Sequence, residues 1–511
     1  MDLVRAHLYS QIEENWTYTD MTVGIRYRDI AEGLRLALDS GALRPGDRVL
    51  SARRLAERER VSLPTALAAL RALETDGLIV ARPRSGYFVC GARASPPATS
   101  KPSRSPQLIT MAALARSVFS GSDQVIAPLG AALPDASWLP VAELQRALNA
   151  AARRIRGGAQ TYSTPPGRAD LRRQIALRAA AWGARFGSDD LVITAGETQA
   201  MRLALRATCR AGDTVAIESP SYFGILLLLE SLGLKALEIP TDPRRGLDVE
   251  LLASAIDRHH PAAVIASPNV QNPLGASLSA EAKQALVDLL IRTDTPLIED
   301  DVYGDLGPGE PRSPACKALD EAGIVLHCSS LSKTLAPGWR IGWIAAGRYH
   351  ERVLNARLEE SLSGTPLFEA ALAEYLAGGD YDRHLRRLRL KIQGGVRAIA
   401  SRVEETFPEG TRFSRPDAGF LLWVELPPSV DSLDVHRRAL AEGISVSPGQ
   451  LFSPQSRFSH HLRLNCANEP TARLLRCVGR IGEICKALDR RFAVDGGART
   501  ERNQIGDLNK D

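Results

Sequence analysis

Residues 91–107 constrain the fold more than any other part of the sequence. They read GARASPPATSKPSRSPQ and are poor in large apolar side chains. Such a stretch cannot bury a core of its own, so we expect a flexible linker. The linker predicts a small head at 22–90 and a large body at 108–490, since the 511 residues suffice for roughly two to four domains. The polar, glycine-containing end at 491–511 is predicted to be a disordered tail.

The head carries most of the positive charge. The whole chain has a formal net charge of +5, whereas residues 22–90 contain twelve Arg and no Lys against eight acidic residues, which is +4. A small basic module attached to a nearly neutral body predicts binding to a polyanion such as nucleic acid. Charge alone leaves open the alternative of a solvated, arginine-rich surface.

The composition points to a reducing, cytoplasmic compartment. The seven cysteines form no Cys-x-x-Cys pair, and the nine histidines lack the spacing of zinc ligands, so we expect no disulfide framework and no metal. No stretch reaches the roughly 18 apolar residues of a membrane span. The first residues lack the basic and apolar blocks of a signal peptide. We therefore expect no membrane partner.

Hydrophobic spacing in the head predicts three helices and a hairpin. Ile30, Leu34 and Leu38 recur at helical intervals, and Ser62 is a plausible N-cap. The expected helices cover 27–40, 52–60 and 62–77, and the expected strands cover 78–81 and 86–89. This order predicts a winged helix-turn-helix, in which the second helix of the turn enters the major groove of DNA.

The run from 41 to 89 resembles the GntR-type winged-helix domain. The resemblance is most specific at Pro45-Gly46-Asp47-Arg48, at 51–56, along 62–77 and at Ser85-Gly86-Tyr87. Leu63-Pro64 stands where an arginine that contacts DNA often follows the capping serine, so other residues must contact the DNA. We assign this role to Arg53, Ser62, Thr65, Arg71, Arg82 and Arg84. The resemblance implies double-stranded promoter DNA as the partner, and a winged helix that binds only protein is the alternative.

The body has the pattern of an α/β fold with a largely parallel sheet. Strand-like segments alternate with helical ones, at 191–194, 214–217, 263–266, 296–298 and 324–327. Ligands of such sheets bind beyond the carboxyl ends of the strands. The residues just after these segments are therefore the candidates for chemistry.

The loop after 324–327 has the composition of a covalent cofactor site. Lys333 lies among hydroxyl side chains and is followed by Arg340. A lysine amine can attack the aldehyde of a phosphate-bearing cofactor, while Ser330, Ser332 and Arg340 bind the phosphate oxygens. A lone Ser-x-Lys would be weak evidence for a cofactor site. The residues at the other strand ends therefore determine whether this interpretation holds.

Those other strand ends supply the remaining parts of a cofactor site. Asp300 can pair with a protonated pyridine nitrogen, and Tyr303 and Asn272 can reach the phenolic oxygen of the ring. Residues 194–198 run from a strand into a helix, so their backbone amides and the Thr198 hydroxyl suit a phosphate. The ring of Tyr222 can stack on the cofactor.

Residues 125–488 resemble the fold-type I aminotransferases of the aspartate aminotransferase superfamily, which bind pyridoxal 5′-phosphate (PLP). The resemblance implies that Lys333 is the catalytic lysine and forms the internal aldimine. It implies a cofactor shell of Tyr162, Gly196, Glu197, Thr198, Tyr222, Asn272, Asp300, Tyr303, Ser330, Ser332, Lys333 and Arg340. Tyr162 matches the tyrosine lent to the partner subunit, which implies a homodimer, and Arg463 matches the arginine that binds an α-carboxylate. A smaller C-terminal α/β subdomain is also implied.

Taken together, 22–490 resembles the MocR/GabR family of bacterial transcription regulators. In that family the PLP body senses an amine or amino acid and changes how a dimer holds DNA. The resemblance implies that the effector forms an external aldimine and alters promoter binding, in a cytoplasmic protein associated with the nucleoid. The alternative is an active aminotransferase, converting an amino acid to a 2-oxoacid, with an auxiliary head. A purely structural scaffold would not require the cofactor shell.

Overall fold

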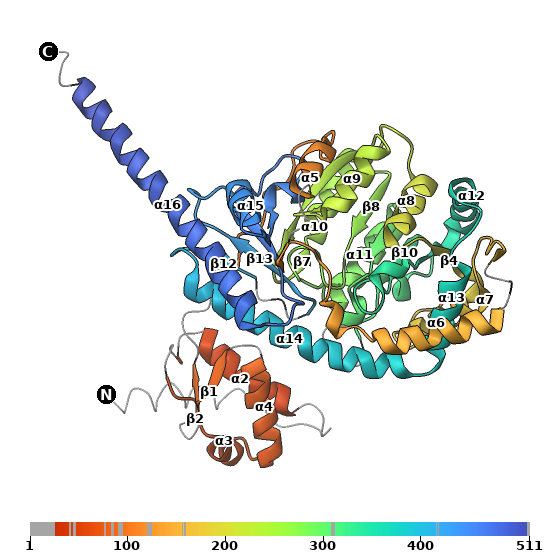
Figure 1. Cartoon of the computed structure of the whole chain (residues 1–511), viewed down its shortest axis with the longest axis horizontal. Coiled ribbons are helices and arrows are strands. Elements are labelled where there is room, and N and C mark those ends of the chain that lie inside the picture. Colours follow the sequence, from red (N-terminus) through yellow and green to blue (C-terminus); the bar gives the residue numbers. More distant parts are fainter. Residues whose placement is uncertain are drawn as a thin grey trace. The chain divides into compact units, whose positions relative to one another are not determined.

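The computed structural model divides the chain into two compact units, the head (residues 1–93) and the body (residues 94–511) (Figure 1). It describes residues 26–39, 42–43, 47–75, 78–82, 86–89, 96–119, 125–155, 157, 160–307, 312–414, 416 and 418–507.

The head is a winged helix-turn-helix. Its elements are α2 (Arg26–Asp39), α3 (Ala52–Arg58), α4 (Leu63–Thr75), β1 (Ile79–Arg82) and β2 (Gly86–Val89). Leu55 and Leu70 are fully buried between the helices, as the hydrophobic spacing requires. The chain before α3 extends the hairpin, because the Val49 N–H donates to the Tyr87 carbonyl at 2.9 Å. The predicted elements agree with these bounds to within two residues.

The body is built on one eight-stranded sheet in the order β4-β11-β10-β9-β8-β5-β6-β7. These strands are β4 (Leu191–Thr194), β5 (Thr214–Ser219), β6 (Lys235–Asp242), β7 (Gly246–Leu247), β8 (Ala263–Ala266), β9 (Leu297–Asp300), β10 (Val325–Ser330) and β11 (Gly342–Ala345). The strands from β10 to β6 run parallel, while β11 and β7 are antiparallel to their neighbours. The mainly parallel sheet predicted from the sequence is confirmed.

Helices cover both faces of this sheet. Val192 packs into a core with α5 (Ala112–Phe119), α8 (Glu197–Thr208), α9 (Phe223–Ser231) and α12 (His350–Glu360). Its neighbours Leu191 and Ile193 face α6 (Val141–Ile155), α7 (Ala169–Ala180) and α13 (Pro366–Ala377) instead. At the other end of the sheet, α10 (Val249–His259) and α11 (Ala280–Arg292) complete this second layer. The alternation of side chains along each strand produces the three-layer arrangement.

A smaller C-terminal subdomain follows the sheet, as predicted. Its strands are β12 (Arg412–Phe413), β13 (Leu421–Glu425), β15 (Ser447–Pro448) and β16 (His461–Asn465), and its helices are α14 (Asp380–Thr406), α15 (Ser432–Ala441) and α16 (Ala472–Asp507). In addition, β3 (Ala127–Pro128) pairs with β14 (Ile444–Ser445). Figure 1 shows α14 running from the region of α6 and α13 to this subdomain. One continuous helix thus connects the two parts of the body.

The second half of the predicted linker is not flexible. Residues 96–107, which we call the strap, lie along the outer edge of β6, where Gln107 and Ala236 exchange backbone hydrogen bonds at 2.8 and 2.9 Å. The strap also reaches the C-terminal subdomain, because the Ala98 N–H donates to Glu425 at 3.2 Å and Arg457 donates to the Lys101 carbonyl at 2.7 Å. A segment poor in large apolar side chains can therefore be ordered largely by hydrogen bonds to its neighbours.

The predicted tail also differs from the structure, since α16 continues through residues 491–507. Helical hydrogen bonds satisfy the backbone N–H and C=O groups of this segment. Each glycine of Gly496-Gly497 costs only about 1 kcal/mol in a helix. The pair of glycines therefore does not end α16.

We predict slow hydrogen exchange in the strap. The Gln107 amide should exchange several-fold more slowly than that of Lys101, since a hydrogen bond contributes about 1 kcal/mol. Residue-resolved exchange by NMR or by fragmentation mass spectrometry measures this difference. Equal rates for the two amides would show that the strap is not held in solution.

Candidate functional site

The predicted cofactor residues meet at one edge of the large sheet. β9 and β10 are parallel, and β4 points in the same direction because both β4 and β10 pair antiparallel with β11. Thr194, Asp300 and Ser330 therefore end their strands at the same edge. The segments that carry Glu197, Tyr303 and Lys333 begin there.

A pair of buried carboxyl groups lies at the centre of this edge. Asp300 is 4% exposed, and its Oδ1 accepts a hydrogen bond from the Val302 N–H at 3.3 Å. Burial, together with the adjacent Asp300, raises the pKa of Glu197 well above its ordinary value. The Glu197 side chain thus faces Asp300 and is not placed as a phosphate ligand. Only its backbone N–H, at the start of α8, suits an anion.

Lys333 projects into the same space. Its Nζ donates to the Ala132 carbonyl at 2.8 Å and lies 5.8 Å from the centre of the Tyr303 ring. Burial lowers the pKa of Lys333 to about 8, although the carboxyl groups of Glu197 and Asp300 oppose this shift. The amine is therefore neutral, and nucleophilic, at a lower pH than an exposed lysine.

Arg463, on β16, is buried without an acidic partner. It is 1% exposed, and no carboxylate of the described residues lies within ion-pairing distance. Its guanidinium donates to the Asn272 side chain at 3.3 Å, to the Ser447 hydroxyl at 3.1 Å and to the Gly130 carbonyl. Burial lowers the pKa of Arg463. A buried cation held only by neutral groups is suited to an anion from outside the protein.

At the other end of the site, the backbone at Gly342 packs closely against the backbone at Gly196. A Cβ at Gly342 would lie 2.6 Å from the carbonyl carbon of Gly196, and a Cβ at Gly196 would overlap the Arg340 guanidinium. Gly196 also has φ +81°, which favours glycine. Arg340 donates to the Pro337 carbonyl at 3.2 Å. This loop brings bare backbone and a guanidinium together, as a phosphate requires.

The hydroxyl side chains around that loop lie at different depths. Ser330 and Ser332 are buried, and the Ser332 N–H donates to the Ser330 hydroxyl at 3.3 Å, whereas Thr198 is exposed. Tyr222 begins α9, and burial raises the pKa of its hydroxyl to about 12. Tyr162 is 75% exposed and does not join the other residues of its own chain.

The donor set of this site fits PLP. Tyr303 Oη, Glu197 Oε1 and Arg463 Nε are buried and have no hydrogen-bond partner among the described residues. PLP offers a phenolic oxygen, a ring nitrogen and a phosphate, and a bound amino acid offers a carboxylate. These groups match the unpartnered atoms and the loop at Gly196.

The predicted DNA contacts of the head are surface residues where the structure describes them. Arg53 on α3 and Arg71 on α4 are exposed. The Ser62 hydroxyl accepts the Thr65 N–H at 3.3 Å and lies 2.8 Å from the Thr65 hydroxyl, so both side chains cap α4. Arg82 ends β1. Arg84 lies outside the described residues.

The sequence did not reveal what holds Lys333 and Arg463 in place. Their partners include the carbonyl oxygens of Ala132 and Gly130, which precede α6. Carbonyl groups have no side-chain signature, so no motif could identify them. Ser447, by contrast, carries a hydroxyl in a segment already assigned to the subdomain.

Comparison with known proteins matches both units to described families. Residues 26–89 match the bacterial regulatory proteins of the gntR family, and residues 128–481 match aminotransferase class I and II. The HTH-type transcriptional regulator YjiR of Escherichia coli is 37% identical over 464 residues, covering 90% of this chain and 98% of YjiR. YdcR, another HTH-type regulator of E. coli, is 36% identical over 461 residues, with the same coverage.

The chain belongs to the MocR-type family of transcription regulators. The body of this MocR-type regulator is similar to the α-aminoadipate aminotransferase LysN of Thermus thermophilus, with 27% identity and a TM-score of 0.67. That similarity covers 73% of this chain and 94% of LysN, whose structure contains N-(5′-phosphopyridoxyl)-L-leucine. Aminotransferase class I and II domains are PLP-dependent, so the cofactor of this family is PLP.

The described residues of this MocR-type regulator contain neither a membrane span nor a metal cluster. Within the ranges given above, no helix is both long and apolar enough to cross a membrane. In the same part of the chain, no group of three His, Cys, Asp or Glu side chains is arranged to hold a metal ion.

We predict that Gly196→Ala weakens PLP binding. The added Cβ would displace Arg340, and the loss of a charge-assisted hydrogen bond costs about 1.5–3 kcal/mol, roughly ten- to hundredfold in affinity. Gly212→Ala is the matched control, since Gly212 has φ +91° and nothing within 4 Å of the added atom. Absorbance titration with PLP measures the affinity. Equal affinities of the two variants would contradict a phosphate site at this loop.

We also predict that Lys333 reacts at unusually low pH. The rate at which apoprotein forms the coloured PLP adduct should rise with a midpoint near pH 8, where burial places the pKa of the amine. Stopped-flow absorbance across the pH range measures this rate, and Lys333→Ala should form no band. A midpoint above about 10, the ordinary lysine range, would contradict the assignment.

Proposed function

We propose that this protein is a PLP-dependent regulator whose DNA binding responds to an amine that also carries a carboxylate. The observation that carries the proposal is Arg463, a buried guanidinium without an acidic partner among the described residues. It lies near Lys333, since the Lys333 Nζ donates to the Ala132 carbonyl and Arg463 donates to the carbonyl of Gly130, two residues earlier. An amino acid offers one group to each residue.

We assign a group of residues to each part of the PLP molecule. When bound, PLP supplies an aldehyde that bonds reversibly to an amine and a ring that accepts electrons. We assign Lys333 to the aldehyde carbon, Asp300 and Glu197 to the ring nitrogen, and Asn272 and Tyr303 to the ring oxygen. The backbone of Gly196 and Glu197, with Thr198, Ser330, Ser332 and Arg340, is assigned to the phosphate, and Tyr222 to stacking.

The strap supports a route from the ligand to the head. It is hydrogen-bonded to β6 of the large sheet at Gln107 and to the C-terminal subdomain at Glu425 and through Arg457. Arg463 belongs to that subdomain, whereas Lys333 belongs to the sheet. A ligand bound between Arg463 and the aldehyde position next to Lys333 would therefore change the position of the subdomain against the sheet. The strap contacts both parts of the body, so it would be displaced with them.

We further propose a homodimer that acts in the cytoplasm on nucleoid DNA. Tyr162 is 75% exposed, as expected of a residue available to the partner subunit's phosphate. Two heads on a symmetric dimer suit two DNA half-sites. In each head, α4 enters the major groove, with Arg53, Ser62, Thr65 and Arg71 near the DNA and Arg82 and Arg84 on the wing.

Transamination is the second candidate function. The low pKa of Lys333, about 8, allows the amine to move a proton at the substrate carbon near neutral pH. Turnover with 2-oxoacids distinguishes the two functions. A regulator should bind its effector with little turnover, whereas an enzyme should release product many times per active site.

We predict that Arg463→Ala abolishes most of the response to an amino acid while leaving the PLP colour intact. Truncating one side of a buried, charge-assisted pair costs about 2–5 kcal/mol, or roughly 30-fold to several thousand-fold in affinity. The ligand concentration that shifts the cofactor spectrum measures the effect. Arg172→Ala is the control, since Arg172 is also buried but bonds to Ser188 and Asp189. If the two variants respond alike, Arg463 does not bind the effector.

We predict that Arg53→Ala and Arg71→Ala weaken promoter binding, and that the logarithmic salt slope falls by about one for each DNA phosphate that is no longer neutralised. The control is Arg28→Ala, an exposed arginine on α2 that bonds to Tyr27. Fluorescence anisotropy with the promoter of the protein's own gene, across salt concentrations, measures the slope. A larger loss for the control would show that α3 and α4 do not face the DNA.

A further inference from the structure

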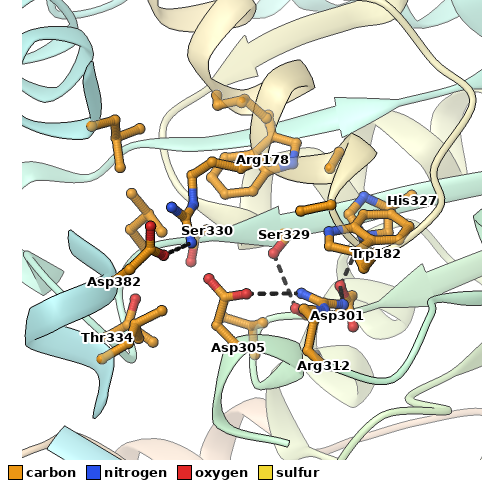
Figure 2. Close-up of a pocket in the computed structure, with 18 of the residues that line it drawn as sticks. Arg178, Trp182, Asp301, Asp305, Arg312, His327, Ser329, Ser330, Thr334 and Asp382 are labelled. Carbon is orange, nitrogen blue, oxygen red and sulfur yellow. Dashed lines mark hydrogen bonds and ion pairs between the residues drawn. The ribbon is translucent and has the colours of Figure 1, made fainter. Parts of the chain in front are cut away.

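A second cavity lies on the other side of the large sheet from Lys333. It has a volume of about 270 Å³ and lies between β10, α7 and the first turns of α14 (Figure 2). Lys333, Asp300 and Arg463 do not line it. At roughly 30 Å³ per water molecule, the space equals about nine waters, which is the size of a small organic molecule. Ser330, which we assign to the phosphate, also lines the cavity, so this cavity adjoins the space assigned to PLP at the end of β10.

The inner wall of the cavity is polar and carries one arginine against two aspartates. Arg312 donates to Asp301 at 2.6 Å and to Asp305 at 3.1 Å, and its guanidinium lies 4.8 Å from the Trp182 ring. Burial opposes ionisation of Asp301, yet Arg312 and His327 together lower its pKa below the ordinary range. Arg312 thus faces two aspartates, so this wall keeps one uncompensated negative charge, and the two ion pairs hold these side chains in place.

One buried atom on this wall lacks a partner. His327 is 1% exposed, and its Nε2 lies 2.9 Å from the Asp301 carboxylate. Because a carboxylate only accepts hydrogen bonds, Nε2 carries a proton, and in the neutral imidazole Nδ1 is then an acceptor. No described residue donates to Nδ1, which is buried. An occupant with a hydroxyl or N–H group would satisfy it.

The remaining charged side chains of the lining give the cavity a positive surplus. Figure 2 shows Arg178 meeting Asp382 on the side away from His327, and the two form an ion pair at 2.9 Å. Arg386, on α14, is exposed and has no hydrogen bond or ion pair with any described residue. In total, four arginines and three aspartates line the cavity, a surplus of one positive charge. A free guanidinium binds a carboxylate through two hydrogen bonds.

The rest of the lining is apolar. Trp182, Trp343 and Leu385 are each more than nine-tenths buried and form walls that a compact hydrocarbon body would contact. Thr334, the residue after Lys333, also borders the cavity, and its hydroxyl lies 2.8 Å from that of Tyr381 on α14. An occupant would thus touch both the helix that connects the two parts of the body and the loop that carries Lys333.

We propose that this cavity binds a small carboxylate with a compact apolar body and a hydrogen-bond donor. It is a second ligand site, which adjoins the amine site proposed above but has neither Lys333 nor Arg463 in its lining. The carboxylate binds at Arg386 in the mouth, the apolar body lies between the tryptophans, and the donor faces His327. The body would thus have two ligand sites, the amine site at the strand ends and this adjoining cavity.

Isothermal titration calorimetry on the full-length protein tests this proposal, with benzoate, salicylate and mandelate as probes. At least one probe should bind saturably with one site per chain, and uncharged benzamide should bind at least about tenfold more weakly. Arg386→Glu should weaken binding by about tenfold or more, because it reverses the surplus charge. Arg387→Glu is the matched control, since Arg387 is the next exposed arginine on α14 but does not line the cavity.

Two further variants separate this site from the cofactor site. Lys333→Ala and Arg463→Ala should leave the affinity for the probe unchanged, whether or not the function proposed above is correct. Binding that disappears in Arg463→Ala, or that is equal in wild type and Arg386→Glu, would place the probe elsewhere and overturn the proposal. So would the absence of binding by all three probes up to about 10 mM.

Discussion

Three consecutive carboxyl groups, Glu299, Asp300 and Asp301, are buried where β9 ends, and much of the body is arranged around them. Burial of one such group without partners would be strongly unfavourable. The carboxylate of Glu299 accepts the N–H groups of Cys316 and Lys317 at 2.6 and 3.0 Å, and Asp301 is compensated by Arg312 and His327. The chain after β9 must therefore return to the sheet at 312–317.

The alternation of these side chains gives them different roles. Asp300 lies on the side of Glu197 and Lys333, while Asp301, the next residue, holds the inner wall of the second cavity. Because these neighbours share one backbone, a shift of the β9 end moves both sites. The MocR-type architecture thus combines a gntR-family head with an aminotransferase class I and II body. In this arrangement, folding and ligand binding depend on the same buried charges.

Local patterns were sufficient to predict the elements of the fold. The helix at α4 followed from the Ser62 cap and the spacing of Leu67, Leu70 and Leu73, and the strand ends followed from short apolar runs. The same patterns located Asp300 and Lys333 at the carboxyl ends of strands. Ligands of parallel sheets bind at these ends. What the sequence could not provide were partners that lack side-chain signals, such as the Gly130 carbonyl at Arg463. The direction of the Glu197 side chain likewise depends on tertiary contact with Asp300.

The strap has a consequence for how the body can exist alone. On its outer side β6 pairs with β7 only at Thr241 and Asp242, and the strap covers the earlier part of that edge at Ala236 and Glu238. Unpaired strand edges recruit other chains and lead to aggregation. A body separated from its head at residue 108 would expose this edge, whereas one that begins at residue 96 would keep it closed. The connection to the head is therefore also the protective cover of the sheet.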